Sequence, residues 1–563
     1  MVEQVKDQSW ALLVDGTVVS VRPVQAADKQ AIAELHNAMS PDNRYLRFFG
    51  FSPDASRRLA ENLCGPAPRR TDGRCALGVW QAGELLGVAH YEVDPANRLE
   101  AEIALAVADR AHSKGIGTLL LEHLASRARA AGIARFTADV LARNAPMLRV
   151  FADAGLRIVE HRDHDVMEVV ASLEVSEAYL DSIAGREAIA QTASLQHVLA
   201  PQSVVVVGAS ERAGNIGGLV VRNLVKAGFL GRVDVVHPVA GTVFGVQAWK
   251  SLADLPSPPE LAVVAVPARA VAETVESCGR LGVRAIVVLT AGIDAGAGRD
   301  ILDRCRHYGM RLVGPNCLGV AVPNRSLDVT FTAHRLRGGV AGVAVQSGGV
   351  GIAVTDQLNR LGIGVSSLVS LGDKLDVSAT DLMQHWSNDH GTELALLYIE
   401  SFGNPRKFAR AAARLSRRIP VLAVDGGRSA PAQRAAISHT AAAATPTAAR
   451  QALFVDAGII AVNDMGDLVA TAALLATQPL PSGRRVAVVS NAGGAGILLA
   501  DACADAGLEL PPLSAPTIER LAEILPRGAT FTNPVDASAG CDRTALAEAV
   551  VALAADPAID AIL

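Results

Sequence analysis

Three segments of this chain repeat one pattern: an aliphatic strand, a turn of small residues and the start of a helix. They are Val204–Ser210, Val340–Gly351 and Val486–Gly496. Further aliphatic runs, such as Leu261–Pro267 and Leu394–Glu400, alternate with helical segments behind these turns. Buried parallel strands read as continuous aliphatic runs, and alternation with helices indicates crossover connections. The pattern predicts several α/β units built on parallel sheets.

The first 170 or so residues follow a different pattern, with paired strands that alternate between an apolar and a more polar face. This favours a mixed α/β domain. We expect strands at Val18–Pro23, Cys75–Trp80, Leu85–Val93 and Ala101–Ala108, and helices at Asp28–Met39 and Thr118–Ala131.

Five segments follow from these patterns along the 563 residues. We expect a mixed α/β domain at 17–172, a helical connector at 173–193, a Rossmann-like unit at 194–325, and flavodoxin-like units at 335–475 and 484–563. The last unit ends in the apolar run Ile559–Leu563, which reads as the start of a strand. We therefore expect the final unit to be incomplete and the chain to be a fragment.

Composition excludes several classes of function. A formal net charge of −5 gives no basic footprint for nucleic acid, and the apolar run Gly338–Thr355 is too rich in glycine for a membrane span. The first ten residues show no secretory signal. The seven cysteines form no CxxC pair, so neither a disulfide framework nor a metal site is expected. We expect a cytoplasmic protein.

A glycine-containing loop follows the expected strand Ala101–Ala108. It reads Arg110-Ala-His-Ser-Lys-Gly-Ile-Gly117 and opens a helix. Glycines let the backbone approach a ligand, and a helix N-terminus offers unpaired N–H groups to phosphate. The loop predicts a diphosphate cradle formed by His112, Lys114, Gly115, Ile116, Gly117 and Thr118. Two ordinary turn glycines and a solvated His112 are the alternative.

With Asn144, Met147 and the Phe151–Leu156 segment, this loop resembles the GNAT superfamily of acetyltransferases over residues 17–170. The resemblance implies that the loop amides and Asn144 bind acetyl-CoA. Many GNAT enzymes protonate the leaving thiolate with a tyrosine, in whose place this chain has Phe151. The resemblance therefore implies a reaction without an enzymic acid.

Glu102 is the candidate general base. An amine with a pKa near 10.4 is protonated at pH 7, and removing its proton to free the lone pair costs about 4.6 kcal/mol. A carboxylate beside the thioester can accept that proton as a general base. Glu102 also matches the glutamate that bacterial GNAT protein-lysine acetyltransferases carry on this strand. A surface glutamate is the alternative, and Glu100 shares the same strand face.

Residues 194–325 carry several motifs at strand ends, among them Gly208-Ala-Ser210, His237-Pro238 and Gly314–Gly319. They resemble the CoA-binding domain of ADP-forming acyl-CoA synthetases and succinyl-CoA ligases. The resemblance implies a second CoA site formed by Gly208, Ala209, Ser210, Pro238, Pro267, Thr290 and Asn316. An NAD site is the alternative, but its G-x-G-x-x-G fingerprint is absent from residues 208–213.

Residues 335–475 resemble the ligase domain of the same synthetases, which phosphorylate a histidine. Here the motif reads Ser438-His-Thr-Ala441, so His439 is the candidate phosphohistidine and Glu400 its orienting carboxylate. The resemblance leaves open a relic His439 without turnover. No ATP-grasp module that could deliver phosphate is recognisable within the chain.

Taken together, the chain resembles multidomain bacterial protein-lysine acetyltransferases. That resemblance implies transfer of acetyl from acetyl-CoA to a lysine of a partner protein, such as an AMP-forming acyl-CoA synthetase, with a synthetase-like region that senses acyl-CoA. The alternatives are an ADP-forming acyl-CoA synthetase subunit that uses a phosphohistidine, and a non-catalytic CoA-responsive module. No nucleic acid or membrane partner is expected, and a homo-oligomer stays open.

Overall fold

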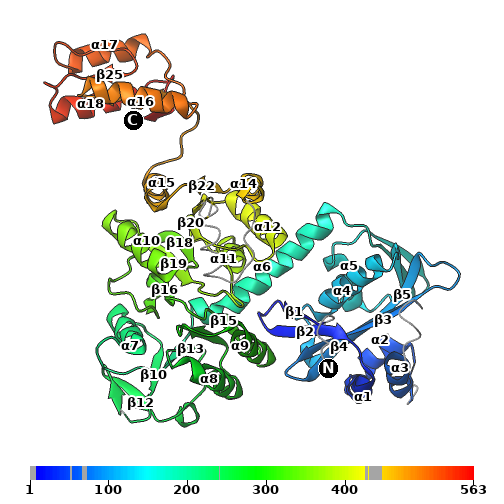
Figure 1. The fold of residues 1–563 in the computed structure, drawn as a ribbon. Coiled ribbons are helices and arrows are strands. Elements are labelled where there is room, and N and C mark those ends of the chain that lie inside the picture. The colour runs from blue at the N-terminus through cyan, green and yellow to red at the C-terminus, as the bar shows by residue number, and fades with distance from the viewer. Residues whose placement is uncertain are drawn as a thin grey trace. The chain divides into compact units, whose positions relative to one another are not determined.

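The computed structural model describes residues 8–50, 54–65, 73–239, 241–424 and 447–563, together with residues 429 and 431. The chain forms two compact units, Met1–Ala476 and Thr477–Leu563 (Figure 1). Three sheets lie in the first unit and short strands in the second. The expected α/β class is confirmed, although antiparallel strands accompany the parallel ones.

The N-terminal part of the first unit is an eight-stranded sheet in the order β1-β2-β3-β4-β5-β6-β8-β7. Its strands are β1 (Ser9–Leu12), β2 (Val18–Pro23), β3 (Arg74–Gln81), β4 (Glu84–Val93), β5 (Glu100–Val107), β6 (Arg135–Leu141), β7 (Ile158–Asp163) and β8 (Val166–Ser172). The associated helices are η1 (Ala26–Asp28), α1 (Lys29–Asn37), α2 (Pro41–Phe48), α3 (Ala55–Cys64), η2 (Asp109–Ala111), α4 (Ile116–Ala130) and α5 (Ala145–Asp153).

Strands β5 and β6 are the one parallel pair of this sheet in the described residues, and they pair over only three positions. The register joins Glu100, Ala101 and Glu102 of β5 to residues 135–137 of β6. Beyond Glu102 both strands continue without pairing to each other in the described structure. The backbone edges of β5 and β6 therefore separate, and Glu102 stands at the point of separation.

The connector between the two halves of the first unit is α6 (Glu177–Leu199), a single helix of 23 residues. Ser176 caps its N-terminus by accepting a hydrogen bond from the Tyr179 backbone. Near its start, Ser182 lies so close to Gly155 that a Cβ there would meet the Ser182 hydroxyl at 2.4 Å. Near its end, Leu195 and Val198 are fully buried in the next core. One helix therefore packs into both halves (Figure 1).

The next sheet has seven strands in the order β11-β12-β10-β9-β13-β14-β15. Its elements are β9 (Ser203–Val207), α7 (Ile216–Ala227), β10 (Arg232–Val236), β11 (Thr242–Val243), β12 (Val246–Trp249), η3 (Leu252–Asp254), β13 (Leu261–Val264), α8 (Ala268–Leu281), β14 (Ala285–Val288), α9 (Ala295–His307) and β15 (Arg311–Val313). Without the antiparallel β11, the strands follow the Rossmann order 3-2-1-4-5-6. The order reverses between β9 and β13, where such sheets bind ligands.

The third sheet has the order β17-β16-β19-β18-β20-β21-β22. Its parallel strands follow the flavodoxin order 2-1-3-4-5, and β16 and β17 add an antiparallel edge. The elements are β16 (Val320–Val322), η4 (Pro323–Arg325), β17 (Leu327–Asp328), β18 (Gly338–Val345), α10 (Gly348–Arg360), β19 (Val365–Ser370), α11 (Ala379–Trp386), β20 (Leu394–Tyr398), α12 (Pro405–Ser416), β21 (Val421–Val424), α14 (Thr447–Asp456), β22 (Ile460–Val462) and α15 (Met465–Thr477).

The second unit pairs one interrupted strand with a strand on each side, since β23 pairs β26 and β24 pairs β25, both in parallel. Its core holds Leu521, Val535 and Leu553. The elements are β23 (Val486–Ala487), β24 (Val489–Ser490), α16 (Gly493–Asp505), α17 (Ala515–Ile524), β25 (Val535–Asp536), α18 (Arg543–Ala554) and β26 (Ala561–Ile562).

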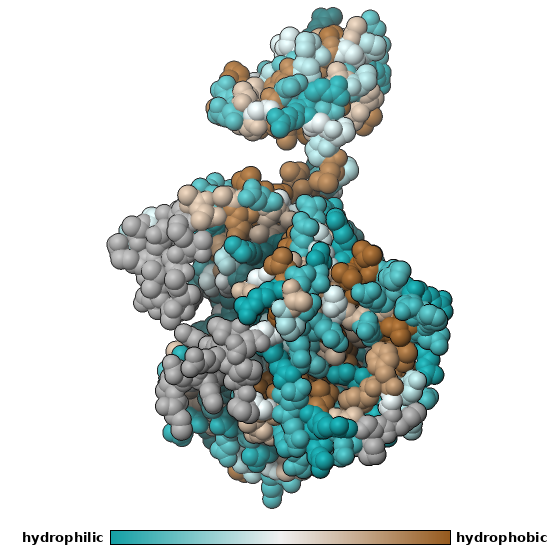
Figure 2. Space-filling view, turned by 90° about the vertical axis from the view of Figure 1, so that its right-hand side faces the viewer, coloured by the Kyte–Doolittle hydropathy of each residue, from teal (hydrophilic) through white to brown (hydrophobic). Residues whose placement is uncertain are grey.

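Polar and apolar residues are interspersed over the described surface seen in Figure 2. Within the described ranges, the structure contains no helix that combines the length and the apolar character needed to cross a bilayer.

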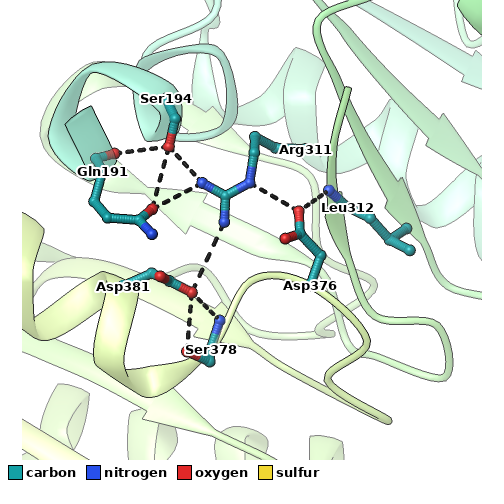
Figure 3. A network of polar contacts seen from close by, with 7 residues as sticks. All are labelled: Gln191, Ser194, Arg311, Leu312, Asp376, Ser378 and Asp381. Carbon is teal, nitrogen blue, oxygen red and sulfur yellow. Dashed lines mark hydrogen bonds and ion pairs between the residues drawn. The ribbon is translucent and has the colours of Figure 1, made fainter. Parts of the chain in front are cut away.

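A buried arginine links α6 to the Rossmann-like and flavodoxin-like parts of the first unit (Figure 3). Arg311 on β15 is 4% exposed, and its Nε donates to Asp376 at 2.8 Å. Its other nitrogens contact Gln191 and Ser194 of α6 and lie 3.8 Å from Asp381 of α11. Burial alone would lower the pKa of Arg311, but Asp376 and Asp381 raise it. The guanidinium is therefore charged, buried and shared by three parts of the fold.

Replacing Arg311 should destabilise the first unit strongly. In Arg311→Met two carboxylates lose their buried cation, and we expect a loss of about 3–5 kcal/mol, measured from the urea midpoint. The matched control is Arg304→Met on α9, whose ion pairs with Asp300 and Glu276 are partly exposed and whose loss should cost about 1 kcal/mol or less. Equal midpoints for the two variants would contradict this assignment.

Candidate acyl-CoA sites

The N-terminal domain contains a cavity of about 1290 Å³ at the point where β5 and β6 separate. Residues 102–107 of β5 and 138–140 of β6 line its walls. The unpaired strand edges there present backbone N–H and C=O groups, which an extended ligand chain can pair with as an added strand would. The cavity could therefore hold an extended molecule along the separated strand edges, with Glu102 in its lining.

The glycine loop closes one end of this cavity. Ser113 and Gly115 both have positive φ, of 63° and 82°, and α4 begins directly after Gly115. A Cβ on Gly117 would meet Val150 at 2.9 Å, so the helix start packs closely against α5. The first N–H groups of a helix have no partner within the helix, so the start of α4 could bind an anion, and the predicted diphosphate role of this loop stays a prediction.

Most of the predicted loop residues line the cavity, but their side chains have partners within the protein. His112 lies 3.1 Å from the Val107 carbonyl through Nε2, and Lys114 forms an ion pair with Asp15 at 3.1 Å and does not line the cavity. Thr118 is 5% exposed, and the Asn144 side chain caps α5 by accepting from the Met147 N–H. The backbone of the loop is therefore what this end offers to a ligand.

The structure distinguishes the two candidate glutamates of β5. Glu102 lines the cavity, whereas Glu100 forms an ion pair with Arg135 on β6 and is not among the lining residues. Glu102, rather than Glu100, therefore borders a space that a ligand could occupy. Phe151, at the position of the usual tyrosine, is 1% exposed in the core and has no proton to donate.

Arg47 is a lining residue that sequence reasoning missed. It stands near the end of α2, a helix that is not among those expected from the sequence. The signal was present: Ser40 caps the helix, Pro41 opens it and Asp42 follows in the first turn. Asp109 then accepts hydrogen bonds from the Ser40 N–H and the Asn43 side chain, both at 2.8 Å, which ties α2 to the glycine loop.

Two histidines near Arg47 are held neutral. Burial, helped by the nearby charge of Arg47, lowers the pKa of His36 to about 4 and that of His90 to about 3. His36 Nδ1 lies 2.8 Å from the Ile32 carbonyl, and His90 stands opposite Ala104 on β5. Neither histidine therefore adds positive charge beside Glu102 at neutral pH.

The Rossmann sheet places its predicted ligand residues at the carboxyl ends of its strands. Gly208 follows β9 with φ 93°, and a Cβ there would meet the Ala265 carbonyl at 2.6 Å. Asn215 fixes this turn, because its Oδ1 accepts from the Ser210 and Gly218 N–H groups at 2.9 and 2.6 Å. Ala209 and Ser210 thus lead to the N-terminus of α7, a position suited to phosphate.

The other predicted CoA residues lie along the same edge. Pro238 follows β10, and Pro267 occupies the N-cap position of α8 after β13. Thr290 follows β14 and donates to the Val266 carbonyl at 2.7 Å. Asn316 has φ 57°, and its side chain donates to Asp373 of the flavodoxin-like sheet at 3.1 Å. The carboxyl edges of the two sheets therefore meet at Asn316.

A polar cluster occupies the carboxyl edge of the flavodoxin-like sheet. Gln346, after β18, accepts from the Glu400 and Ser401 N–H groups at 2.6 and 3.0 Å. Lys374 donates to the Ser401 hydroxyl at 2.8 Å and to its carbonyl. Burial lowers the pKa of Lys374 to about 8, and Glu400 opposes the shift. Sequence reasoning named Glu400 but missed Lys374, which follows the Gly372–Asp373 turn.

The candidate phosphohistidine His439 lies outside the described residues. Its position relative to Glu400 therefore stays a prediction, as do the ligand roles of all residues named above. Within the described ranges, no three His, Cys, Asp or Glu side chains gather in a way that could hold a metal ion.

Four family descriptions match the chain in succession. They are "Acetyltransferase (GNAT) family" over residues 32–156, "CoA binding domain" over 202–323, "Succinyl-CoA ligase like flavodoxin domain" over 337–475 and "Ligase-CoA domain" over 486–563. The fold and the sites thus define a GNAT domain followed by a CoA-ligase region.

Individual relatives identify that region further. The chain is 33% identical over 375 residues to the alpha subunit of ADP-forming acetate–CoA ligase II from Pyrococcus furiosus, with 66% of this chain and 81% of the relative covered. A solved acetyl-coenzyme A synthetase from Ca. Korarchaeum cryptofilum, in complex with phosphate and ADP, superposes with a TM-score of 0.63 at 31% identity. That match covers 65% of this chain and 81% of the solved one.

Longer relatives are covered only in part. The ADP-forming acetate–CoA ligase of Methanocaldococcus jannaschii is 35% identical over 347 residues, which are 61% of this chain and 49% of that ligase. The chain spans about half the length of such relatives. With the alpha-subunit match, it belongs to the family of ADP-forming acetate–CoA ligases.

The family corrects the main function expected from the sequence. Acetylation of protein lysines, with the synthetase-like region as a sensor, is wrong on this comparison, and the ADP-forming synthetase alternative is better supported. The expectation rested on the combination of the N-terminal domain with a synthetase-like region, whereas the identity with ligases extends over 375 residues. A GNAT domain is nevertheless present.

The neutral histidines predict an acid-sensitive N-terminal domain. Their folded pKa values lie below the usual 6.5, so the stability they contribute is present above about pH 6.5 and is lost as the pH falls toward 4. The loss is at most about 1.4 kcal/mol per pH unit for each histidine. His90→Gln should therefore flatten the decline of the urea midpoint between pH 6.5 and 4.5.

The control for this prediction is His164→Gln, since the side chain of His164 is 94% exposed. An unchanged slope in the His90 variant would show that the protonation of His90 is not linked to unfolding.

Proposed function

We propose that residues 194–563 work as the alpha-type part of an ADP-forming acyl-CoA ligase, with domains at 194–325, 335–475 and 484–563. The observation that carries this proposal is the 33% identity to an alpha subunit of such a ligase over 81% of its length. An ATP-binding part, outside this chain, would complete the reaction.

The meeting of two sheet edges supports this function. CoA would bind along Gly208–Ser210, Pro238, Pro267 and Thr290, with Asn316 at the boundary to the flavodoxin-like sheet. Because Asn316 contacts Asp373, a thioester held on the first sheet would lie near Asp373, the residue before Lys374 of the polar cluster. Acyl and phosphoryl groups could then exchange without leaving the protein.

The chemistry needs a phosphate site beside the thioester. Phosphate attacks the acyl carbon, the C–S bond breaks, and CoA and an acyl phosphate result. The imidazole of His439 then takes the phosphoryl group and releases the carboxylate, while Glu400 fixes its tautomer. Lys374 and the first N–H groups of α10 would stabilise the phosphate oxygens. The phosphohistidine finally passes its phosphoryl group to ADP on the ATP-binding part.

The first half of this reaction is testable on the chain alone. With acetyl-CoA and ³²P-labelled phosphate, we expect acid-labile, base-stable label on His439 together with release of CoA thiol. His439→Asn should abolish the label. Glu400→Gln should slow labelling by about 10²-fold or more, the usual scale for losing a positioned acid–base partner.

The matched control is His390→Asn, an exposed histidine of the same domain. Equal labelling of the His439 variant and the wild type would refute the phosphohistidine assignment. Absence of label in the wild type would refute the alpha-type function itself.

A second function is supported by a separate observation, the separation of β5 and β6 beside Glu102. In this domain, residues 17–172, an amine would attack the thioester of a bound acyl-CoA and Glu102 would take its proton. The C–N bond forms, the C–S bond breaks, and the CoA thiolate leaves and takes a proton from water, because Phe151 has none to give.

A further inference from the structure

The end of the GNAT cavity beside Glu102 holds a cation without an anion in contact. Arg47 lines the cavity, its Nε is buried, and no described residue accepts a hydrogen bond from that nitrogen. Glu102 is close enough to act on it electrostatically, yet among the described residues no ion pair joins Arg47 to a carboxylate. The guanidinium instead lies 5.4 Å from the Phe48 ring centre.

Arg47 nevertheless stays charged. Burial lowers its pKa to about 10, and Glu102 opposes the shift, so the guanidinium is protonated at neutral pH. A desolvated charge is costly unless it is paired. The planar fork of an arginine matches a carboxylate with two parallel hydrogen bonds. The cavity therefore presents a charged guanidinium that an anionic group of a ligand could pair with.

No other described cation of the cavity meets this description. Arg186 at the α6 side forms an ion pair with Glu122, and Arg149 on α5 is exposed. His36 and His90 are neutral near neutral pH. The phosphates of a bound CoA would lie at the other end, over Gly115 and Gly117. Arg47 is thus left for the reacting partner rather than for the CoA.

We propose that the acyl acceptor of the GNAT cavity is a small amine that carries a carboxylate, as an amino acid does. Glu102 faces its ammonium group and Arg47 binds its carboxylate. The inference rests on the proposed acyl transfer at Glu102. The two side chains would present opposite charges to a molecule that carries both, whereas an acceptor with only an ammonium group would leave the half-buried Arg47 unpaired.

The reaction balances with the groups on hand. Glu102 accepts one proton from the ammonium, and the free amine attacks the thioester carbon. The attacking nitrogen then loses its second proton to water, and the C–S bond breaks as the amide forms. CoA leaves as thiolate. The carboxylate of the acceptor keeps its charge throughout, so its contact with Arg47 holds the amine in place during the attack.

The test uses the full chain with acetyl-CoA in a phosphate-free buffer and follows thiol release. Each amino acid is paired with its decarboxylated amine: lysine with cadaverine, and alanine with ethylamine. We expect kcat/KM to be at least about tenfold higher for the amino acid, the scale of a charged hydrogen-bonded contact. Arg47→Met should bring the two to parity, chiefly through KM, and Arg47→Lys should restore part of the preference.

Arg44→Met is the matched control, since it makes the same change on the same helix at a residue that does not line the cavity; it should keep the preference. Calorimetry with CoA shows that the Arg47 variants still fold and bind. Parity in the wild type, or a preference that survives Arg47→Met, overturns the inference.

Two further outcomes separate this inference from the function beneath it. If Arg47→Met changes only the discrimination between succinyl-CoA and acetyl-CoA, Arg47 serves the acyl donor and the acceptor assignment is wrong. Thiol release from no amine at all refutes the acyl transfer as well, whereas release from every amine with equal efficiency refutes the acceptor class alone.

Discussion

The buried charge of Arg311 is the interaction on which the arrangement of the first unit depends. A guanidinium this far from water is tolerated only if all its contacts are present. Its contacts come from the end of α6, from the segment that holds Asp376 and from α11. Asp376 stands three residues after Asp373, which contacts Asn316. Satisfying one cation therefore also holds together the carboxyl edges of the Rossmann-like and flavodoxin-like sheets.

The two halves of the first unit would make room for the proposed CoA thioesters by different means. In the Rossmann-like half, a strand ends in a glycine turn and the next helix starts, so that the ligand lies outside the sheet. In the GNAT half, two parallel strands stop pairing and the ligand can enter the sheet itself. The first arrangement would expose a ligand to the neighbouring domain, as the proposed exchange of acyl and phosphoryl groups requires. The second encloses the reacting end.

Elements that are determined by a short run of neighbouring residues could be predicted from the sequence. The strand Val18–Pro23 and the glycine turns at Gly115 and Gly208 follow from aliphatic runs and small residues, and the structure has them. Arg311 and Arg47 could not be found in this way, because their importance comes from what burial removes and from partners up to 120 residues away. The helix that carries Arg47 was readable from Ser40 and Pro41, and it was overlooked.

The connector α6 joins the GNAT domain to the ligase region as a single long helix that packs against both. At 1.5 Å per residue its 23 residues form a rod of roughly 35 Å. The β1–β2 turn packs on it as well, since a Cβ on Gly16 would meet the Ser194 backbone at 2.5 Å. The same turn carries Asp15, the ion-pair partner of Lys114. Separating the two domains at α6 would thus remove packing contacts from each of them. Neither domain is therefore a module that can be exchanged freely.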